Sequence, residues 1–465
     1  MMINNLFCKL IDKQQVSLWV IVFYGLFIFA ASSCMGDPEY KKEHSIGTEF
    51  AEKGSWQQAI THYDKAINLN REYASAYVDR GFANYKLNNI EEAFNDYSEA
   101  IEIEPANFKA LSSRAEIHAF NGDFQLALKD LDLAISEKND DPSYYIMKGK
   151  ILGSLGQMDN AIKQFELALD LDSELSDAYY NIGITYLSLY EYSNSIQYFE
   201  KAIKFDANNA EAYANKGVAF AANEDYISAT SEFSRAIEID PKQINYYQNR
   251  ARAFELSGKY DFAVKDYDSI LNLNSEMPEV FFLRANAYVQ LGQIDLAIAD
   301  YDEVLLLSPL FEDAYMNRAE IYFQTQQYDL AIADYLKLEE INPDSSSVQN
   351  GLGLAHYYSG DIQLALDNFA KSIELDPSLA DTYNNRAAVF LNVGLIEQAI
   401  IDLNEAINLD PEFGLAFANR AVAYALIGNM DLLERDLDMA VILGVDRDQL
   451  LLQINQLMDA NNQSQ

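Results

Sequence analysis

The residue types best suited to nucleophilic catalysis or metal binding are scarce in this chain of 465 residues. It has only two cysteines, Cys8 and Cys34, which are too few for a disulfide framework or a four-ligand zinc site. The four histidines are scattered, at His44, His62, His118 and His356. We find no Ser-His-Asp or Cys-His set and no glycine-rich phosphate loop. The sequence therefore predicts no catalytic residue, no metal site and no cofactor.

The net charge of the chain limits the kinds of partner that it can bind. The chain has 72 acidic residues against 33 lysines and arginines, which gives a formal net charge of -39. A surface that binds phosphate backbones needs the opposite sign, so the composition argues against a nucleic-acid partner. We expect instead a protein or peptide partner that is neutral or mildly basic.

The N-terminus has the order of a secretory signal. Residues 16–31 form an uncharged apolar run, preceded by Lys9 and Lys13 and followed by Ser32 and Ser33. A permanent membrane span usually takes about 20 apolar residues, and this run is shorter. We expect residues 1–33 to be a signal peptide that directs the rest of the chain across a membrane.

Cys34 follows the small residues directly. The segment Ala31-Ser32-Ser33-Cys34 resembles the lipobox of bacterial lipoproteins, although that family more often has Leu where Ala31 stands and Gly or Ala where Ser33 stands. The resemblance implies cleavage before Cys34 and lipidation of Cys34, with 34–39 as a short linker. It also implies a membrane-anchored protein on the periplasmic or outer-membrane side of a bacterial envelope. The alternative is an uncleaved signal anchor with an incidental cysteine.

A small residue recurs every 34 residues through the rest of the chain, without insertion or deletion. It is found at Gly47, Gly81, Ala115, Gly149, Gly183, Gly217, Ala251, Ala285, Ala319, Gly353, Ala387 and Ala421. With this residue as position 8, residues 40–447 divide into twelve repeats. These are 40–73, 74–107, 108–141, 142–175, 176–209, 210–243, 244–277, 278–311, 312–345, 346–379, 380–413 and 414–447. No segment remains for a second domain.

Other positions keep the same period. Position 4 is mostly aromatic, position 11 is mostly Phe or Tyr, position 20 is mostly Ala, and position 24 is Tyr, Phe or Leu throughout. Pro recurs at position 32, as in Pro105 and Pro241. This pattern strongly resembles the tetratricopeptide repeat family. The resemblance implies an all-α, right-handed superhelical solenoid of twelve helix-turn-helix repeats whose concave face binds protein partners.

The period also predicts how the elements position their side chains. At 100° per residue, positions 4, 8 and 11 share one face of a first helix, and positions 17, 20, 24 and 27 share one face of a second. Gly at position 15 is suited to end the first helix. A single hairpin cannot bury its own apolar face, so the repeats must stack. Residues 448–465 are predicted to be a capping helix and tail, opened by Asp446 with Gln449 three residues later.

Seven repeats carry Arg at position 7 and Asp at position 23. The pairs are Arg80 and Asp96, Arg114 and Asp130, Arg250 and Asp266, Arg284 and Asp300, Arg318 and Asp334, Arg386 and Asp402, and Arg420 and Asp436. The arginines alone could form a track for an acidic partner. Because the charges appear and disappear on both helices together, we interpret them as structural ion pairs that bridge each hairpin.

Positions 2, 5, 9, 12 and 13 lie opposite the packed face of the first helix. We call this set the groove stripe, because in tetratricopeptide proteins it typically lines the binding groove. Its candidate groove contacts are Phe82, Tyr85, Tyr180, Ile184, Phe282, Met316, Phe323, Tyr357 and Tyr358. The alternative is that several of these side chains pack against the next repeat.

Together these features predict a non-catalytic interaction scaffold. It would be a membrane-anchored tetratricopeptide lipoprotein that binds partner proteins or peptides on its concave face and serves the assembly of an envelope complex. The assembly role rests on family resemblance alone. The alternative is a receptor for a small envelope ligand, such as a glycan or a peptidoglycan fragment.

Overall fold

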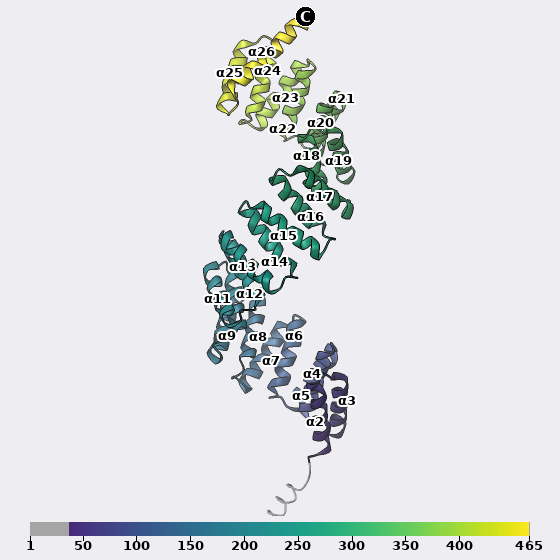
Figure 1. Cartoon of the computed structure of the whole chain (residues 1–465), viewed down its shortest axis with the longest axis vertical. Helices are drawn as coiled ribbons and strands as arrows, with labels where there is room; N and C mark the ends of the chain where they lie inside the picture. The colour runs from purple at the N-terminus through teal and green to yellow at the C-terminus, as the bar shows by residue number, and fades with distance from the viewer. Residues whose placement is uncertain (1–36, 465) are drawn as a thin grey trace, which may run out of the picture. The chain divides into compact units, whose positions relative to one another are not determined.

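The computed structural model describes residues 37–464 (Figure 1). These residues form helices α2 to α26 and contain no strand. The predicted signal peptide, the predicted lipidation site Cys34 and the first half of the predicted linker, residues 34–36, lie outside the described residues. The all-α fold class is confirmed for the described part of the chain.

The helices come in pairs, one pair for each predicted repeat. The first helices are α2 (Glu39–Glu52), α4 (Ala74–Lys86), α6 (Phe108–Phe120), α8 (Pro142–Ser154), α10 (Ser176–Ser188), α12 (Ala210–Ala222), α14 (Ile244–Leu256), α16 (Pro278–Gln290), α18 (Glu312–Gln324), α20 (Ser346–Ser359), α22 (Ala380–Asn392) and α24 (Gly414–Leu426). The second helices are α3 (Trp56–Leu69), α5 (Ile90–Ile103), α7 (Phe124–Glu137), α9 (Met158–Leu171), α11 (Tyr192–Phe205), α13 (Tyr226–Ile239), α15 (Tyr260–Leu273), α17 (Ile294–Leu307), α19 (Tyr328–Ile341), α21 (Ile362–Leu375), α23 (Ile396–Leu409) and α25 (Met430–Ile442). The last helix is α26 (Arg447–Ser464).

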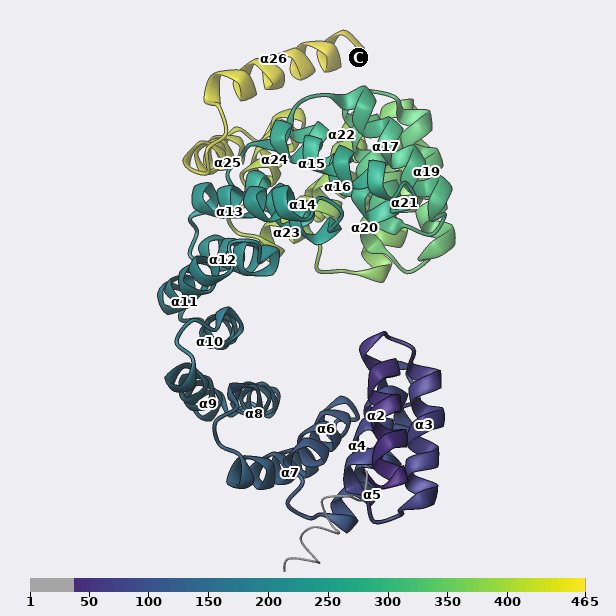
Figure 2. The same cartoon turned by 60° about the horizontal axis from the view of Figure 1, so that its bottom comes forward.

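The described chain divides into two compact blocks of six repeats each. The N-terminal block contains α2 to α13, and the C-terminal block contains α14 to α26. In the N-terminal block each first helix also contacts the first helix of the next repeat, from α2 with α4 to α10 with α12. Figure 2 shows α6, α8 and α10 on the inner side of this block's curve, with α7, α9 and α11 outside them. The groove stripe therefore belongs to helices on the inner side of the block.

Close approach of the two helices explains the small residue at position 8. A Cβ atom added at Gly183 would lie 2.7 Å from Cε1 of Phe199, and one added at Gly353 would lie 2.6 Å from Cε1 of Phe369. Both phenylalanines occupy position 24 and are fully buried. The aromatic ring of the second helix thus fills the space that the small residue of the first helix leaves.

The turn between the two helices uses a left-handed residue at position 15. The predicted glycines there all have positive φ, from 69° at Gly292 to 98° at Gly360. In the remaining four repeats the same position also has positive φ, near 60°, at Asn88, Tyr190, Glu224 and Gln326. The helical pair therefore imposes the left-handed turn even where the residue has a Cβ atom that disfavours it.

The C-terminal cap begins one residue earlier than predicted, at Arg447, and its helix runs to Ser464. Asp446 accepts a hydrogen bond from the backbone N–H of Gln449 at 2.8 Å, as expected for a residue that opens a helix. Leu450 and Ile454 of α26 are buried in a cluster with residues of α24 and α25. The last helix therefore covers the apolar end of the C-terminal block.

The structure brings all seven predicted arginine–aspartate pairs together, with nitrogen–oxygen distances of 2.5 to 2.7 Å. In each pair the guanidinium donates to both carboxylate oxygens, as Arg318 does to Asp334. The seven aspartates are only 1 to 6% exposed. Because the carboxylates are buried, these pairs hold the hairpins together and the arginines do not form an open track for an acidic partner.

Several of these arginines also donate a hydrogen bond to the preceding repeat, which was not predicted from the sequence. Arg80 donates to Asp64 at 2.6 Å, and Arg284 donates to Asp268 at 2.5 Å. Arg318 makes the same bond to Asp302. In all three cases the acidic residue lies at position 25 of the preceding repeat, sixteen residues before the arginine. We call this arrangement of one arginine between two acids a bracket, and it joins neighbouring repeats as well as the two helices of one repeat.

Repeats 1, 5 and 10 have no basic residue at position 7 and use other polar contacts. In repeat 1, Nδ1 of His62 lies 2.7 Å from Oε2 of Glu43. In repeat 5, the hydroxyl of Ser195 donates to the carbonyl of Gly183 at 2.8 Å. At repeat 10, Glu339 of the preceding repeat accepts hydrogen bonds from Gln349 and Lys371. The polar link between helices is thus kept, although the residues that make it differ.

Removal of one bracket should test its contribution. Burial raises the pKa of the Asp334 carboxyl, whereas the hydrogen bonds from Arg318 act in the opposite direction. The substitution Arg318→Met would leave Asp334 buried without its main partner, and we expect a loss of about 3–5 kcal/mol in the free energy of unfolding. Urea denaturation followed by circular dichroism measures this loss.

The double variant Arg318→Met/Asp334→Leu should recover much of that stability, because it removes the buried charge as well. Arg235→Met, at an exposed pair with Glu238, is the matched control and should leave the denaturation midpoint nearly unchanged. If the stability losses of Arg318→Met and Asp334→Leu simply add in the double variant, the pairing of Arg318 with Asp334 is contradicted.

Substitution by alanine should have opposite effects on stability at two glycines of α8. A Cβ atom at Gly149 would lie 2.4 Å from Cε1 of the buried Phe165, so Gly149→Ala should cost about 1–3 kcal/mol through overpacking. A Cβ atom at Gly153 would meet nothing within 4 Å, so Gly153→Ala should raise stability by up to about 1 kcal/mol. Thermal denaturation of the two variants would refute this packing if Gly149→Ala were the more stable.

Candidate functional site

The nine candidate groove contacts differ in how accessible they are. Phe82 and Tyr358 are exposed, at 44% and 55%. The other seven are half-buried: Tyr85, Tyr180, Ile184, Phe282, Met316, Phe323 and Tyr357. The groove stripe is therefore a partly covered surface and not a row of fully exposed side chains.

Some of these residues do pack on neighbouring repeats, as the packing alternative predicted. Phe282 packs against a core cluster that includes Ala314 and Ile321 of the next repeat, and its ring lies 5.1 Å from that of Phe311, the last residue of its own repeat. The hydroxyl of Tyr180 accepts a hydrogen bond from Asn215 of the next repeat at 3.1 Å, and burial raises the pKa of Tyr180. These two side chains contribute to the contact between repeats.

Four aromatic residues of repeats 9 and 10 form a cluster that includes three candidate contacts. Tyr358 stacks on Tyr328 with a centroid distance of 5.7 Å, and it also contacts Phe323 at 5.5 Å and Tyr357 at 5.1 Å. We call these four residues the aromatic cluster. The half-exposed ring of Tyr358 is its most accessible member.

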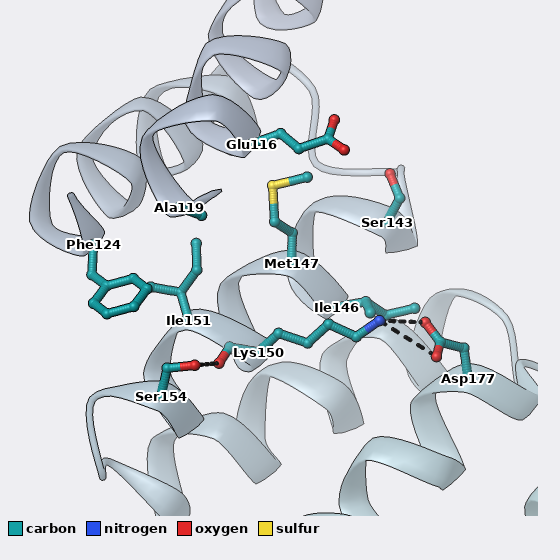
Figure 3. A pocket seen from close by; sticks show the side chains of 10 residues that line it. All are labelled: Glu116, Ala119, Phe124, Ser143, Ile146, Met147, Lys150, Ile151, Ser154 and Asp177. Atoms are coloured by element: carbon teal, nitrogen blue, oxygen red, sulfur yellow. Dashed lines mark hydrogen bonds and ion pairs between the residues drawn. The ribbon is translucent and has the colours of Figure 1, made fainter. Parts of the chain in front are cut away.

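The N-terminal block contains a cavity of about 440 Å³ on the groove stripe (Figure 3). It is lined by Glu116, Ala119, Phe124, Ser143, Ile146, Met147, Lys150, Ile151, Ser154 and Asp177. These residues come from α6, α7, α8 and α10. Figure 3 shows Phe124, Ile151 and Met147 on one side of the cavity and the Lys150–Asp177 pair on the other.

The electrostatics of this cavity come from three side chains. Nζ of Lys150 lies 3.1 Å from Oδ2 of Asp177. Glu116 accepts a hydrogen bond from the hydroxyl of Tyr85 at 2.9 Å, and this bond raises the pKa of Tyr85. The candidate contact Tyr85 thus holds a carboxylate at the cavity.

A second cavity, of about 370 Å³, lies on the other side of α8. It is lined by Gly149, Lys150, Gly153, Ser154, Met158, Phe165, Asn181, Ile184, Thr185 and Ser188. The candidate contact Ile184 therefore lies in a cavity, and Lys150 and Ser154 line both cavities. Gly153 is not among the candidate residues predicted from the sequence. Its signal is a glycine at position 12, in the last turn of a first helix and away from the turn glycine at position 15.

Two smaller cavities lie in the C-terminal block. One, of about 270 Å³, lies between α16 and α18 and includes the side chains of Asn286, Asn317 and Glu320. The other, of about 190 Å³, includes the candidate contact Tyr357 and is bordered by Leu457 of the capping helix. Neither contains the exposed ring of Tyr358.

Within residues 37–464, no group of three His, Cys, Asp or Glu side chains is arranged to hold a metal ion. His118 and His356 lie at position 11 with an Nδ1 atom that has no hydrogen-bond partner, which fits rings packed in the core. None of the helices described here is both long and apolar enough to cross a membrane.

Several curated proteins match parts of this chain. Human sperm-associated antigen 1 is 30% identical over 100 residues, which cover 22% of this chain and 11% of that protein. A TPR repeat-containing protein of Rhizobium etli is 29% identical over 100 residues, or 21% of this chain and 49% of that protein. The match thus spans about a tenth of the human relative and half of the bacterial one.

Solved structures with similar folds include yeast Tom70 and a tetratricopeptide repeat protein from Parabacteroides merdae. Tom70 has a TM-score of 0.36 and 18% identity, with 91% of this chain and 96% of that chain covered. The Parabacteroides merdae protein has a TM-score of 0.42 and 21% identity, with coverage of 54% and 98%.

Family models for the tetratricopeptide repeat match residues 74–107, 176–209, 210–243, 282–346 and 380–413. A further model, described as TPR repeat, matches residues 47–88 and 149–189. Together the matches cover more than half of the chain. Proteins with these repeats generally mediate protein–protein interactions. The chain belongs to the tetratricopeptide repeat family.

Proposed function

We propose that this chain is a non-catalytic scaffold that binds a protein or peptide partner along the groove stripe of its first helices. The observation that carries the proposal is the pair of adjoining cavities on α8, which are lined mainly by residues of the first helices. Both exceed the roughly 300 Å³ at which ligand sites typically begin. The arginine brackets hold the helices together, so the groove stripe is the surface that contributes least to packing.

The non-catalytic part of the proposal is supported by the family and by the described residues. Tetratricopeptide scaffolds are typically non-catalytic. Residues 37–464 consist of paired repeat helices and a capping helix, with their acidic side chains spread along the solenoid.

We propose further that the protein is anchored to a membrane by lipid on Cys34, on the outer side of a bacterial envelope, where it serves the assembly of an envelope complex. Support comes from the sequence, in the apolar run at 16–31, the lysines before it and the lipobox-like Ala31–Cys34 segment. Two acyl chains hold a protein stably on a bilayer, whereas one does so only marginally.

The small-ligand alternative has one observation in its favour. The cavity between α16 and α18 carries amide groups of Asn286 and Asn317 that could bind a glycan's hydroxyls. Its volume of about 270 Å³ is below the usual range for small-molecule sites. We therefore favour the protein partner.

Lipid labelling tests the anchor. Cells that express the protein are fed an alkyne-tagged fatty acid, and we expect the label on the wild type and on a Cys8→Ala control but not on Cys34→Ala. Labelled Cys34→Ala would refute the lipoprotein proposal. Unlabelled wild type that stays in the membrane fraction would favour the uncleaved anchor.

Capture of a partner tests the scaffold. Intact cells are treated with a membrane-permeant amine crosslinker, and the protein is purified from the membrane fraction. We expect at least one protein to co-purify with the wild type and to be reduced in a Cys34→Ala preparation that has lost the membrane. If the anchored protein yields no crosslinked protein, the scaffold proposal is wrong.

A further inference from the structure

We propose that the two cavities flanking α8 form one trough for an extended partner segment in which an arginine or lysine lies two residues from an aliphatic side chain. This inference rests on the proposed function and specifies which part of the groove stripe is used and what it recognises. The trough is defined by the residues that line the two cavities of the N-terminal block.

The first cavity is suited to an aliphatic side chain. Its walls are the side chains of Phe124, Ile146, Met147 and Ile151, and Ile151 is 96% buried. Figure 3 shows Met147, Ile151 and Phe124 facing the same space. A methionine wall adapts to the shape of an inserted side chain because its thioether is flexible and polarizable.

The rim of the first cavity has an unbalanced negative charge. Lys150 and Asp177 neutralise each other across the gap between α8 and α10. Glu116 forms no ion pair with any residue in 37–464, and its carboxylate accepts a hydrogen bond from the neutral Tyr85 hydroxyl. A carboxylate at the rim of an apolar cavity attracts a cation on the incoming segment, and the net charge of -39 favours the same sign.

Continuity between the cavities follows from their shared residues. Lys150 and Ser154 line both, so the trough passes over the last turn of α8. In an extended chain, residues i and i+2 point to the same side. One such pair can place its aliphatic side chain in the first cavity and its cation at Glu116, while the main chain crosses α8.

Gly153 lies where that main chain would cross. It is part of α8 with ordinary helical backbone, and a Cβ atom there would meet nothing within 4 Å. Glycine inside a helix costs about 0.5–1 kcal/mol relative to alanine, and no neighbouring atom requires it here. Gly149, one turn earlier, is different, because Phe165 occupies the space of its Cβ atom. Bare backbone at Gly153 lets a partner's backbone approach closely.

The experiment uses the purified full-length protein in detergent and an array of immobilised synthetic decapeptides of varied sequence. We expect the wild type to retain peptides with Arg or Lys two residues from Leu, Ile or Met. The dissociation constant of a retained peptide is then measured by fluorescence anisotropy for the wild type and for each variant.

Gly153→Leu should fill the crossing point and weaken binding by at least about tenfold, with an unchanged or higher melting temperature. Ala221→Leu is the matched control, because Ala221 holds the same position 12 on α12 and lines neither cavity. It should change the dissociation constant by less than about twofold.

The cation preference is tested at Glu116. Glu116→Gln should weaken binding of the cationic peptide by about two- to fivefold, as expected for a partly exposed charge pair. Glu116→Lys should shift the array preference at that peptide position from Arg or Lys to Asp or Glu and leave the aliphatic preference in place.

The outcomes separate this inference from the proposed function. If the wild type retains peptides but Gly153→Leu binds them as tightly as Ala221→Leu does, the trough is wrong and peptide binding stands. Retention of acidic peptides by the wild type would overturn the role of Glu116. If the wild type retains no peptide, both the trough and peptide binding by this chain are wrong.

Discussion

A helical hairpin of 34 residues cannot bury its own apolar face, and the structure of this chain follows from that constraint. Each repeat packs one face of its two helices inward, with Phe199 or an equivalent ring against the small residue at position 8. Within each block, part of the remaining apolar surface packs against the next repeat, and α26 covers the C-terminal end. Stability is therefore shared between neighbours, and every repeat must present a matching face.

The arginine brackets add polar specificity to this packing. A carboxylate that is almost fully buried, such as Asp334, is costly without its partner, so the bracket favours one arrangement of the two helices. Where the acid at position 25 of the preceding repeat also accepts a bond, as Asp302 does from Arg318, the same arginine fixes the next interface too. With the arginines engaged in this way, we propose that partners are recognised by the groove stripe.

Much of the fold was predictable from the sequence because the repeats have no insertions. The period gave the helical pairs, the small residue at position 8, and the pairing of residues sixteen apart. It did not reveal that Asp64 or Asp268 would reach the following repeat, since that contact depends on how two hairpins stack. It also did not predict a left-handed backbone at Tyr190. The prediction of a left-handed residue at position 15 relied on glycine, and Tyr190 is not a glycine.

The candidate site was predicted less completely. The helical wheel placed Ile184 and Tyr85 on the groove stripe, where Ile184 lines a cavity and Tyr85 contacts Glu116. The half-burial of Tyr180 and Phe282 depends on contacts between repeats that one hairpin does not show. Gly153 was not predicted because what distinguishes it is the open space around the position of a Cβ atom, and the sequence pattern does not show that space.

The central claim is that partners bind along the first helices, and photo-crosslinking tests it most directly. A photoreactive amino acid is placed at Ser154, on the first-helix surface of α8, or at the exposed Glu166 of the second helix α9, in cells that contain the natural partners. The account predicts a crosslinked protein from Ser154 and none from Glu166. A crosslinked protein from Glu166 with none from Ser154 would contradict it.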